Sequence, residues 1–114
     1  MNFFRIANSF RVTRVTGPSH NFLGLEFTDV RTEELIIEPH PPIGPTPPIL
    51  DHEKVKQQVL RGVDEGNVYF GTKYVVKRIE FVPNDSPPSE IYKLLAYSIV
   101  ERLAHKLPFP EGRV

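Results

Sequence analysis

The sequence contains no cysteine and no tryptophan, one methionine, and seven glycines among its 114 residues. The lack of cysteine excludes disulfide frameworks, thiolate zinc sites and cysteine nucleophiles, and it fits a reducing cytoplasm. No apolar run reaches the roughly 18 residues that suggest a membrane span, or the roughly 7–15 residues of a signal peptide core. With 14 basic and 14 acidic residues the net charge is zero, which excludes polybasic arms and acidic tails. We therefore expect a soluble cytoplasmic protein with no membrane partner and no DNA partner.

Length and proline distribution predict one domain with an internal connector. The chain has the length of a single domain, residues 1–114, and its 39% hydrophobic content is enough for one core. Six of the 12 prolines fall within residues 39–48. A segment with so many fixed φ angles and so few backbone donors forms neither a helix nor a central strand. We expect it to be an extended, polyproline-like surface connector between a strand-rich front and a helix-containing back.

The front of the chain is predicted to form strands. Residues 6–15 are rich in β-branched and aromatic side chains, and residues 17–21 have turn composition. In residues 23–28 apolar and other side chains alternate, as in a strand with one buried face. The short link between these runs predicts an antiparallel hairpin. Residues 35–37 are a candidate third strand.

The back of the chain is predicted to contain two helices and one strand. Asp51 suits the N-cap of a helix that ends near Glu65, with Gly66 following its last turn. Residues 74–82 form the clearest strand pattern, and Ser86 with Pro87 suits the start of a second helix. That helix has an apolar stripe of Ile91, Leu94, Leu95, Ser98, Ile99, Arg102 and Leu103.

The resulting order, β-β-β-α-β-α, predicts an α+β fold. We expect an antiparallel or mixed sheet of about four strands with both helices packed on one face. The alternative is a sheet that is completed across a dimer, because four strands leave an open edge.

No catalytic, metal or cofactor motif is present, and we predict none of these sites. The four histidines show no helical i, i+4 pair and no HExxH motif. His40, Asp51, His52 and Glu53 flank the proline connector and could surround an ion, but the favoured interpretation is a solvated loop histidine and a first-turn helix residue. Asp85 beside Ser86 is better explained by helix capping than by nucleophilic catalysis.

Two features of the sequence are typical of binding proteins. The proline connector matches PxxP at residues 39–42 and 42–45, although no basic residue lies alongside, so a rigid spacer is favoured. The second feature is positive charge interleaved with aromatic residues on the predicted strands, as phosphate-backbone binding requires. The basic residues concerned are Arg11, Arg14, Lys73, Lys77 and Arg78, and the aromatic ones are Phe10, Tyr74 and Phe81.

One stretch combines a helix end at residues 61–66, a strand at residues 74–79 and a polar turn at residues 84–90. In this order residues 55–104 resemble the fourth domain of the translation elongation factor G group. The resemblance implies a fold of the ribosomal protein S5 second-domain type and contact with RNA or the ribosome. Residues 82–85 depart from the histidine and Val-Asp that the family places before the serines of its turn. Residues 55–104 include no nucleotide-binding domain, so the resemblance does not imply GTP hydrolysis.

These observations favour a small non-enzymatic binding or interaction domain. Its partner would be an unidentified protein or a second copy of the chain in a homodimer. The alternative is an RNA- or ribosome-associated protein that uses the five basic residues named above. A small enzyme that uses His40, His52 and Asp85 is less favoured, because those groups would have to converge on one pocket.

Overall fold

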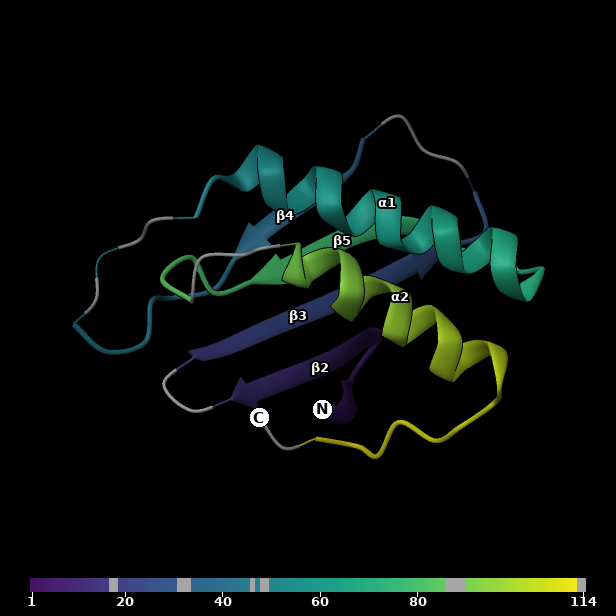
Figure 1. The fold of residues 1–114 in the computed structure, drawn as a ribbon, viewed down its shortest axis with the longest axis horizontal. Helices are drawn as coiled ribbons and strands as arrows, with labels where there is room; N and C mark the ends of the chain where they lie inside the picture. Colours follow the sequence, from purple (N-terminus) through teal and green to yellow (C-terminus); the bar gives the residue numbers. More distant parts are fainter. Residues whose placement is uncertain (17–18, 31–33, 46, 48–49, 86–89, 113–114) are drawn as a thin grey trace.

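The computed structural model describes residues 1–16, 19–30, 34–45, 47, 50–85 and 90–112. It confirms the predicted α+β class and places two helices on a mixed sheet that has five strands rather than about four (Figure 1). In chain order the elements are β1 (Asn2–Ile6), β2 (Ser9–Thr16), β3 (Ser19–Thr28), β4 (Ile36–Pro39), α1 (His52–Phe70), β5 (Val75–Phe81) and α2 (Ile91–Ala104).

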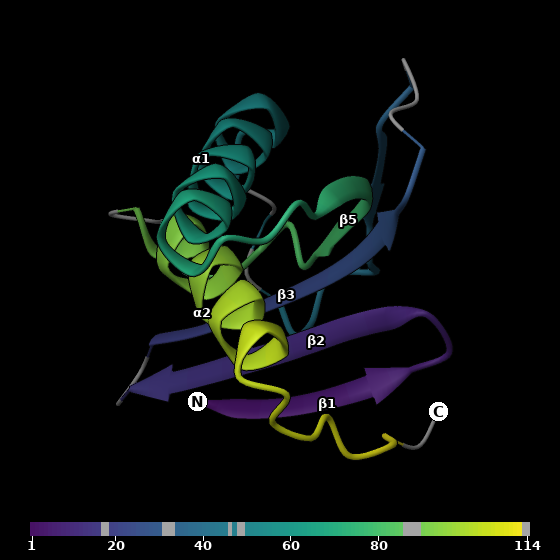
Figure 2. The ribbon, with the colours of Figure 1, turned by 90° about the vertical axis from the view of Figure 1, so that its right-hand side faces the viewer.

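The strand order across the sheet is β1-β2-β3-β5-β4. All neighbouring strands are antiparallel except β4 and β5, which are parallel. Figure 2 shows both helices on the same side of the sheet, so in the described part of the chain the other face carries no helix. We call it the helix-free face.

The connection from β4 through α1 to β5 is a left-handed crossover. In Figure 1 the two parallel strands point left, the helices lie in front of the sheet, and the chain passes from β4 down to β5. About 98% of such crossovers are right-handed. This handedness is the most unusual feature of the topology, and no local sequence pattern predicts it.

The core lies between the sheet and the helices. Alternate strand residues, among them Val12, Leu23 and Ile79, are fully buried on the helix side. Val55 and Val59 of α1 are buried with them, as the four-residue spacing of valines predicts. Because side chains alternate along a strand, the residues between these core positions face the helix-free side.

The N-terminal strand prediction was wrong in one respect. Residues 6–15 are not one strand, because β1 and β2 are separated by a tight turn at Ala7 and Asn8. Ala7 has a φ of 53°, a left-handed conformation that glycine adopts more easily. The sequence therefore lacks the glycine that normally marks such a hairpin. The predicted third strand is present as β4.

The first helix is longer than predicted. It continues past Glu65 to Phe70 and ends at Gly71, whose φ of 69° is typical of a helix C-cap. Gly66 lies inside the helix, where it packs against Val100 of α2. Its small size serves helix packing and not helix termination.

The second helix begins at Ile91, with Glu90 at its N-cap. The predicted cap at Ser86 and Pro87 lies outside the described residues. Most of the predicted apolar stripe is buried, but Leu94 is 44% exposed.

The proline-rich connector is attached to the turn that follows β5. The amide of His40 donates to the carbonyl oxygen of Phe81, and the amide of Leu50 donates to that of Pro83. Between them, the backbone of Ile43 both donates to and accepts from the side-chain amide of Asn84, at 3.0 and 2.6 Å. The beginning of the connector therefore lies beside the carboxyl end of β5.

Candidate binding site

Glu80 is the centre of a polar cluster on the helix-free face. It lies on β5 between the core residues Ile79 and Phe81, so its side chain points to the opposite face, yet only 5% of the residue is exposed. Oε1 accepts a hydrogen bond from Ser9 Oγ at 2.5 Å, and Oε2 accepts from Nη2 of Arg11 at 2.8 Å. The same Oε2 is 2.7 Å from Nε2 of His40.

These partners keep Glu80 ionised. Burial raises the pKa of its carboxyl, but the hydrogen bonds from Ser9 and His40 and the charge of Arg11 outweigh it, so the pKa lies below the ordinary value of 4.5. Because an ionised carboxylate only accepts hydrogen bonds, Nε2 of His40 carries the proton in this contact. The Nδ1 atom of His40 is then an acceptor in the neutral ring.

A second buried carboxylate lies beside a second histidine. Asp85 is fully buried in the turn after β5. Its Oδ2 accepts from the Phe22 amide of β3 at 2.8 Å, and its Oδ1 lies 3.0 Å from Nε2 of His20. Burial raises the pKa of Asp85 above the ordinary 3.8, although the Phe22 amide and His20 act against this shift.

Both histidines line one pocket of about 350 Å³ at this corner of the sheet, which we call the two-histidine pocket. β2 and β3 supply most of its wall, and the start of the connector and the end of β5 complete it. Its lining residues are Arg11, Thr13, Val15, His20, Asn21, Phe22, His40, Ile43 and Val82.

Phe22 connects the charged and apolar parts of this pocket. Its ring centre is 5.1 Å from that of His40, and Cζ of Arg11 lies 5.6 Å from it, within the range of a cation–π contact. Val15 and Ile43 add apolar surface and are 72% and 62% exposed. Pockets with apolar walls and a few fixed polar groups are typical of small-molecule sites.

Three of the five predicted basic residues lie beside acidic partners. Arg11 pairs with Glu80, Arg78 pairs with Glu26 and Glu38, and Lys77 lies 3.5 Å from Glu26. Lys77 is the extra residue of a bulge, because Glu26 pairs with Arg78 while Phe27 pairs with Val76. Such a bulge redirects a side chain. These residues form a mixed-charge surface and not a continuous basic one.

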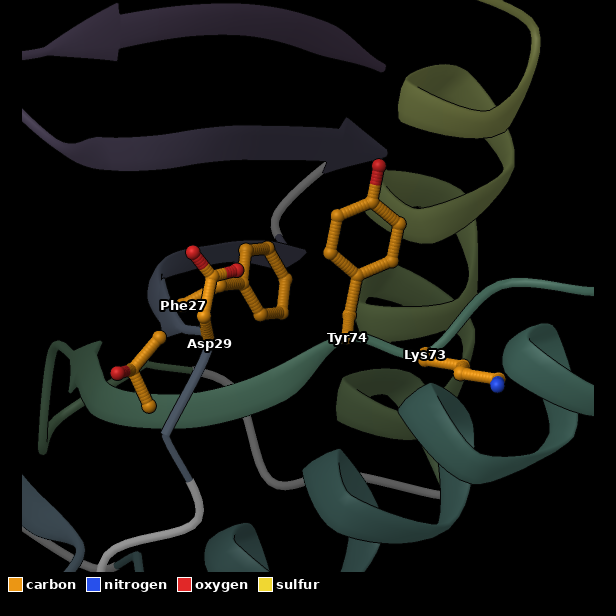
Figure 3. A pocket seen from close by; sticks show the side chains of 5 residues that line it. Phe27, Asp29, Lys73 and Tyr74 are labelled. Atoms are coloured by element: carbon orange, nitrogen blue, oxygen red, sulfur yellow. The ribbon is translucent and has the colours of Figure 1, made fainter.

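Arg14 and Lys73 are placed elsewhere. Arg14 follows Thr13 on β2, so it points to the helix side of the sheet. Lys73 lines a different pocket, of about 490 Å³, with Phe27, Asp29 and Tyr74. Figure 3 shows the Phe27 and Tyr74 rings side by side, with the Lys73 side chain pointing away from them.

The aromatic residues predicted to accompany the basic ones belong to the helix side. Phe81 is fully buried in the core, and Phe10 and Tyr74 pack against it. The aromatic ring beside Arg11 is that of Phe22 instead. The predicted interleaving of basic and aromatic side chains is therefore not present at those positions.

The groups flanking the connector do not gather around an ion. Asp51 accepts from the amides of Glu53 and Lys54 as the predicted helix cap, and the His52 ring packs edge-on against Phe81. His40 is not a solvated loop residue but a partner of Glu80. Among the described residues no three His, Asp or Glu side chains are arranged to hold a metal ion.

The structure joins two of the predicted residues to two that the sequence did not indicate. His40 and Asp85 reach the same pocket, Asp85 through its contact with His20. The sequence reasoning missed His20 and Glu80. The one signal for Glu80 in the sequence is its place between the apolar residues Ile79 and Phe81 in the clearest strand pattern.

Comparison with protein-family models, with curated proteins and with solved structures found no match to this chain. In the described part of the chain, neither helix has the length and apolar character needed to cross a membrane.

Proposed function

We propose that this chain is a small ligand-binding domain whose binding site is the two-histidine pocket. The observation that carries the proposal is the pair of buried carboxylates behind one pocket wall: Glu80 is hydrogen-bonded to His40, and Asp85 lies 3.0 Å from His20. Burying a carboxylate is costly unless it is paired. A fold that maintains two such carboxylates behind one open pocket has its polar groups pre-organised for a ligand.

Chemical-shift mapping tests this proposal. Phenol, indole and benzamide are titrated separately into the ¹⁵N-labelled chain, and amide shifts are followed by NMR. We expect at least one probe to shift the amides of Thr13, Val15, Phe22 and Ile43. Shifts confined to the pocket beside Phe27, or no saturable shifts from any probe, would contradict the proposal.

A pair of exposed apolar positions provides the matched variants. Ile43→Ser removes apolar surface from the rim of the two-histidine pocket, and Val68→Ser removes it from α1, where Val68 is 86% exposed. Both side chains lie outside the core, so both variants should fold. We expect Ile43→Ser to weaken probe binding about fivefold or more, in line with the loss of roughly 1 kcal/mol of apolar contact, and Val68→Ser to leave it unchanged.

A catalytic role is the second candidate, and the His40–Glu80 contact favours it. A carboxylate behind an imidazole orients a general base, and His40, whose Nε2 is bound by Glu80, lines the pocket. Turnover of any substrate that disappears in His40→Gln would replace the binding proposal with this one.

The RNA-binding alternative stays a proposal that the resemblance to the elongation factor G domain motivates. Its support is the placement of Arg11, Lys77 and Arg78 on one sheet, although each lies beside a carboxylate. Phosphate contacts predict an affinity that falls steeply as salt rises. Co-sedimentation with ribosomal RNA at low and moderate salt tests this prediction.

A further inference from the structure

The two-histidine pocket presents the basic partners of its buried carboxylates. The side chains of Glu80 and Asp85 are 7% and 0% exposed, whereas those of Arg11, His40 and His20 are 17%, 28% and 46% exposed. The carboxylates thus lie behind their partners. A ligand in the pocket meets the guanidinium and imidazole groups first.

Arg11 has donor capacity that none of the described residues uses. Its Nε donates to Ser9 Oγ at 3.1 Å, and its Nη2 donates to Glu80 at 2.8 Å. Within the described residues, Nη1 makes no hydrogen bond. Since Glu80 fixes the guanidinium beside the Phe22 ring, Nη1 is held in a defined position at the pocket wall.

His40 supplies a second group next to Arg11. Its Nε2 is held by the same Glu80 oxygen that binds Arg11, so the two side chains lie close together. A histidine side chain changes charge between about pH 5 and 8. Protonation makes Nδ1 a donor and adds a positive charge beside the guanidinium.

The rest of the pocket is suited to an apolar body. Val15 and Ile43 form exposed apolar walls, and the Phe22 ring packs beside His40 and Arg11. A volume of about 350 Å³ is at the lower end of the range for small-molecule sites. The pocket therefore has room for a single-ring compound and not for a large cofactor.

From these contacts we infer that the two-histidine pocket binds a small organic anion. The carboxylate or phosphate of the ligand accepts from Arg11 Nη1 and from Nδ1 of the protonated His40 ring, and its flat apolar part lies against Phe22, Val15 and Ile43. This inference rests on the proposed function and specifies the ligand class of the same site.

Binding should be proton-linked. His40 faces Glu80 of β5 and Arg11 of β2, and the lowered pKa of Glu80 keeps this carboxylate ionised between pH 6 and 8. The other titratable groups at the pocket are His20 and Asp85. Nδ1 of His40 is an acceptor in the neutral ring and a donor in the protonated ring, so an anion that contacts Nδ1 favours the protonated ring and binds more tightly as the pH falls.

The test compares benzoate and phenyl phosphate with benzamide, the neutral counterpart of benzoate. Each is titrated into the full chain at pH 6 and pH 8 and followed by amide shifts. We expect at least one anion to bind tenfold or more tightly than benzamide at pH 6. Benzoate carries the same charge at pH 6 and pH 8, so its affinity should fall fivefold or more by pH 8, whereas phenyl phosphate gains charge over this range. The tighter anion identifies the preferred head group.

The outcomes separate this inference from the proposed function. Equal binding of benzoate, phenyl phosphate and benzamide at the pocket would overturn the organic-anion inference and leave the binding function intact. Failure of these three probes, of phenol and of indole to shift the pocket amides would overturn both.

Three variants complete the test. Arg11→Gln should lower anion affinity tenfold or more, while Arg61→Gln, which removes the same charge from an exposed pair between α1 and the N-cap of α2, should not. Because Arg11→Gln leaves Glu80 without its cation and can unfold the chain, His40→Gln is the second variant. Its amide still donates to Glu80 but takes no proton, so anion affinity at pH 6 should fall towards the value at pH 8. Unchanged affinity in a folded His40→Gln protein would overturn the assigned role of His40.

Discussion

At the scale of single residues, Glu80 links three segments of the chain. Its carboxylate binds Ser9 and Arg11 of β2 and His40 of the connector, all from a position on β5. Removing one member of a buried ion pair is strongly destabilising because the partner keeps its charge without compensation. Glu80 is therefore important for stability as well as for the shape of the pocket.

Glu80→Gln should lower the free energy of unfolding by about 2–4 kcal/mol at pH 7. Glu38→Gln is the matched control, because that side chain is 49% exposed and its pair with Arg78 should contribute less than about 1 kcal/mol. The folded-state pKa of Glu80 is lowered, so its contribution is present above pH 4.5 and is lost as the pH falls further. In urea unfolding, the free energies of the natural chain and of Glu80→Gln should differ at pH 7 and approach each other at pH 3.5.

Asp85 should have the opposite pH dependence. Its folded-state pKa is raised by burial, so the protonated form favours folding, and stability falls as the pH rises from 3.8 through the folded-state pKa. Asp85→Asn keeps an acceptor for the Phe22 amide and cannot ionise. Relative to the natural chain, the variant should gain stability between pH 4 and pH 7 in urea unfolding. A constant difference across this range would show that Asp85 does not titrate as described.

Single residues were the least predictable part of the site. Glu80 follows the alternation of β5, but its burial depends on Ser9, Arg11 and His40, which are 40 to 71 positions away in the chain. His40 lies in a proline-rich segment whose composition indicates only an extended surface connector. The Asn84 contact with Ile43 brings this segment to the sheet. No local sequence pattern predicts a contact between residues so far apart in the chain.

At the scale of elements, the two helices pack closely because α1 carries small residues where it meets α2. A methyl group added at Gly62 would lie 2.3 Å from the carbonyl oxygen of Lys93, and one at Gly66 would lie 2.8 Å from Val100. The spacing of four residues places both glycines on the same face of α1. From the sequence alone, Gly66 indicated the end of the helix, because a glycine that follows an apolar run commonly marks a helix C-terminus.

Gly62→Ala should destabilise the protein by about 1–3 kcal/mol. The overpacking against backbone atoms exceeds the roughly 1 kcal/mol that alanine gains over glycine in a helix. Asp64→Ala, at an exposed position of the same helix, should change stability by less than about 0.5 kcal/mol or increase it slightly. Thermal unfolding of both variants checks this; a stabilised Gly62→Ala protein would contradict the described helix contact.

Element types were largely predictable, whereas some boundaries were not. The valine spacing of α1 and the alternation of β3 and β5 each indicate the correct structure. The turn at Ala7 was missed because alanine rarely adopts a positive φ. The end of α1 was missed because Gly66 and Gly71 are both possible C-caps in the sequence, and only packing against α2 separates them.

At the scale of the whole molecule, both edges of the sheet are protected. Beyond β1, the amide of Arg5 donates to Pro110 and the amide of Gly112 donates to Arg5, so the C-terminal segment covers that edge. The other edge, β4, has four residues and includes Pro39 and the exposed Glu38. Short strands, prolines and charges are typical of edges that do not pair with another chain.

We therefore expect a monomer. Sedimentation velocity at about 10 and 100 µM should show one species with the mass of a single chain at both concentrations. A dimer that forms in this range would revive the alternative of a sheet completed by a second copy. Glu38→Val could then show whether β4 is the edge that pairs.

The handedness of the β4–α1–β5 crossover belongs to the same scale. The α+β class and the position of both helices on one face follow from the order of elements. The left-handed connection does not, because the usual rule favours the other hand. The attachment of the connector to Asn84 and Pro83 holds this connection in place after it has formed.

The most direct test of the account is the state of the His40 ring, measured by long-range ¹H–¹⁵N NMR of the histidine side chains. We predict that neutral His40 carries its proton on Nε2, facing Glu80, and that adding benzoate at pH 6 shifts its Nδ1 resonance. The exposed His52, which packs against Phe81, serves as an internal control and should not respond. A His40 ring protonated on Nδ1 when neutral, or one that benzoate leaves unchanged, would contradict the proposed site.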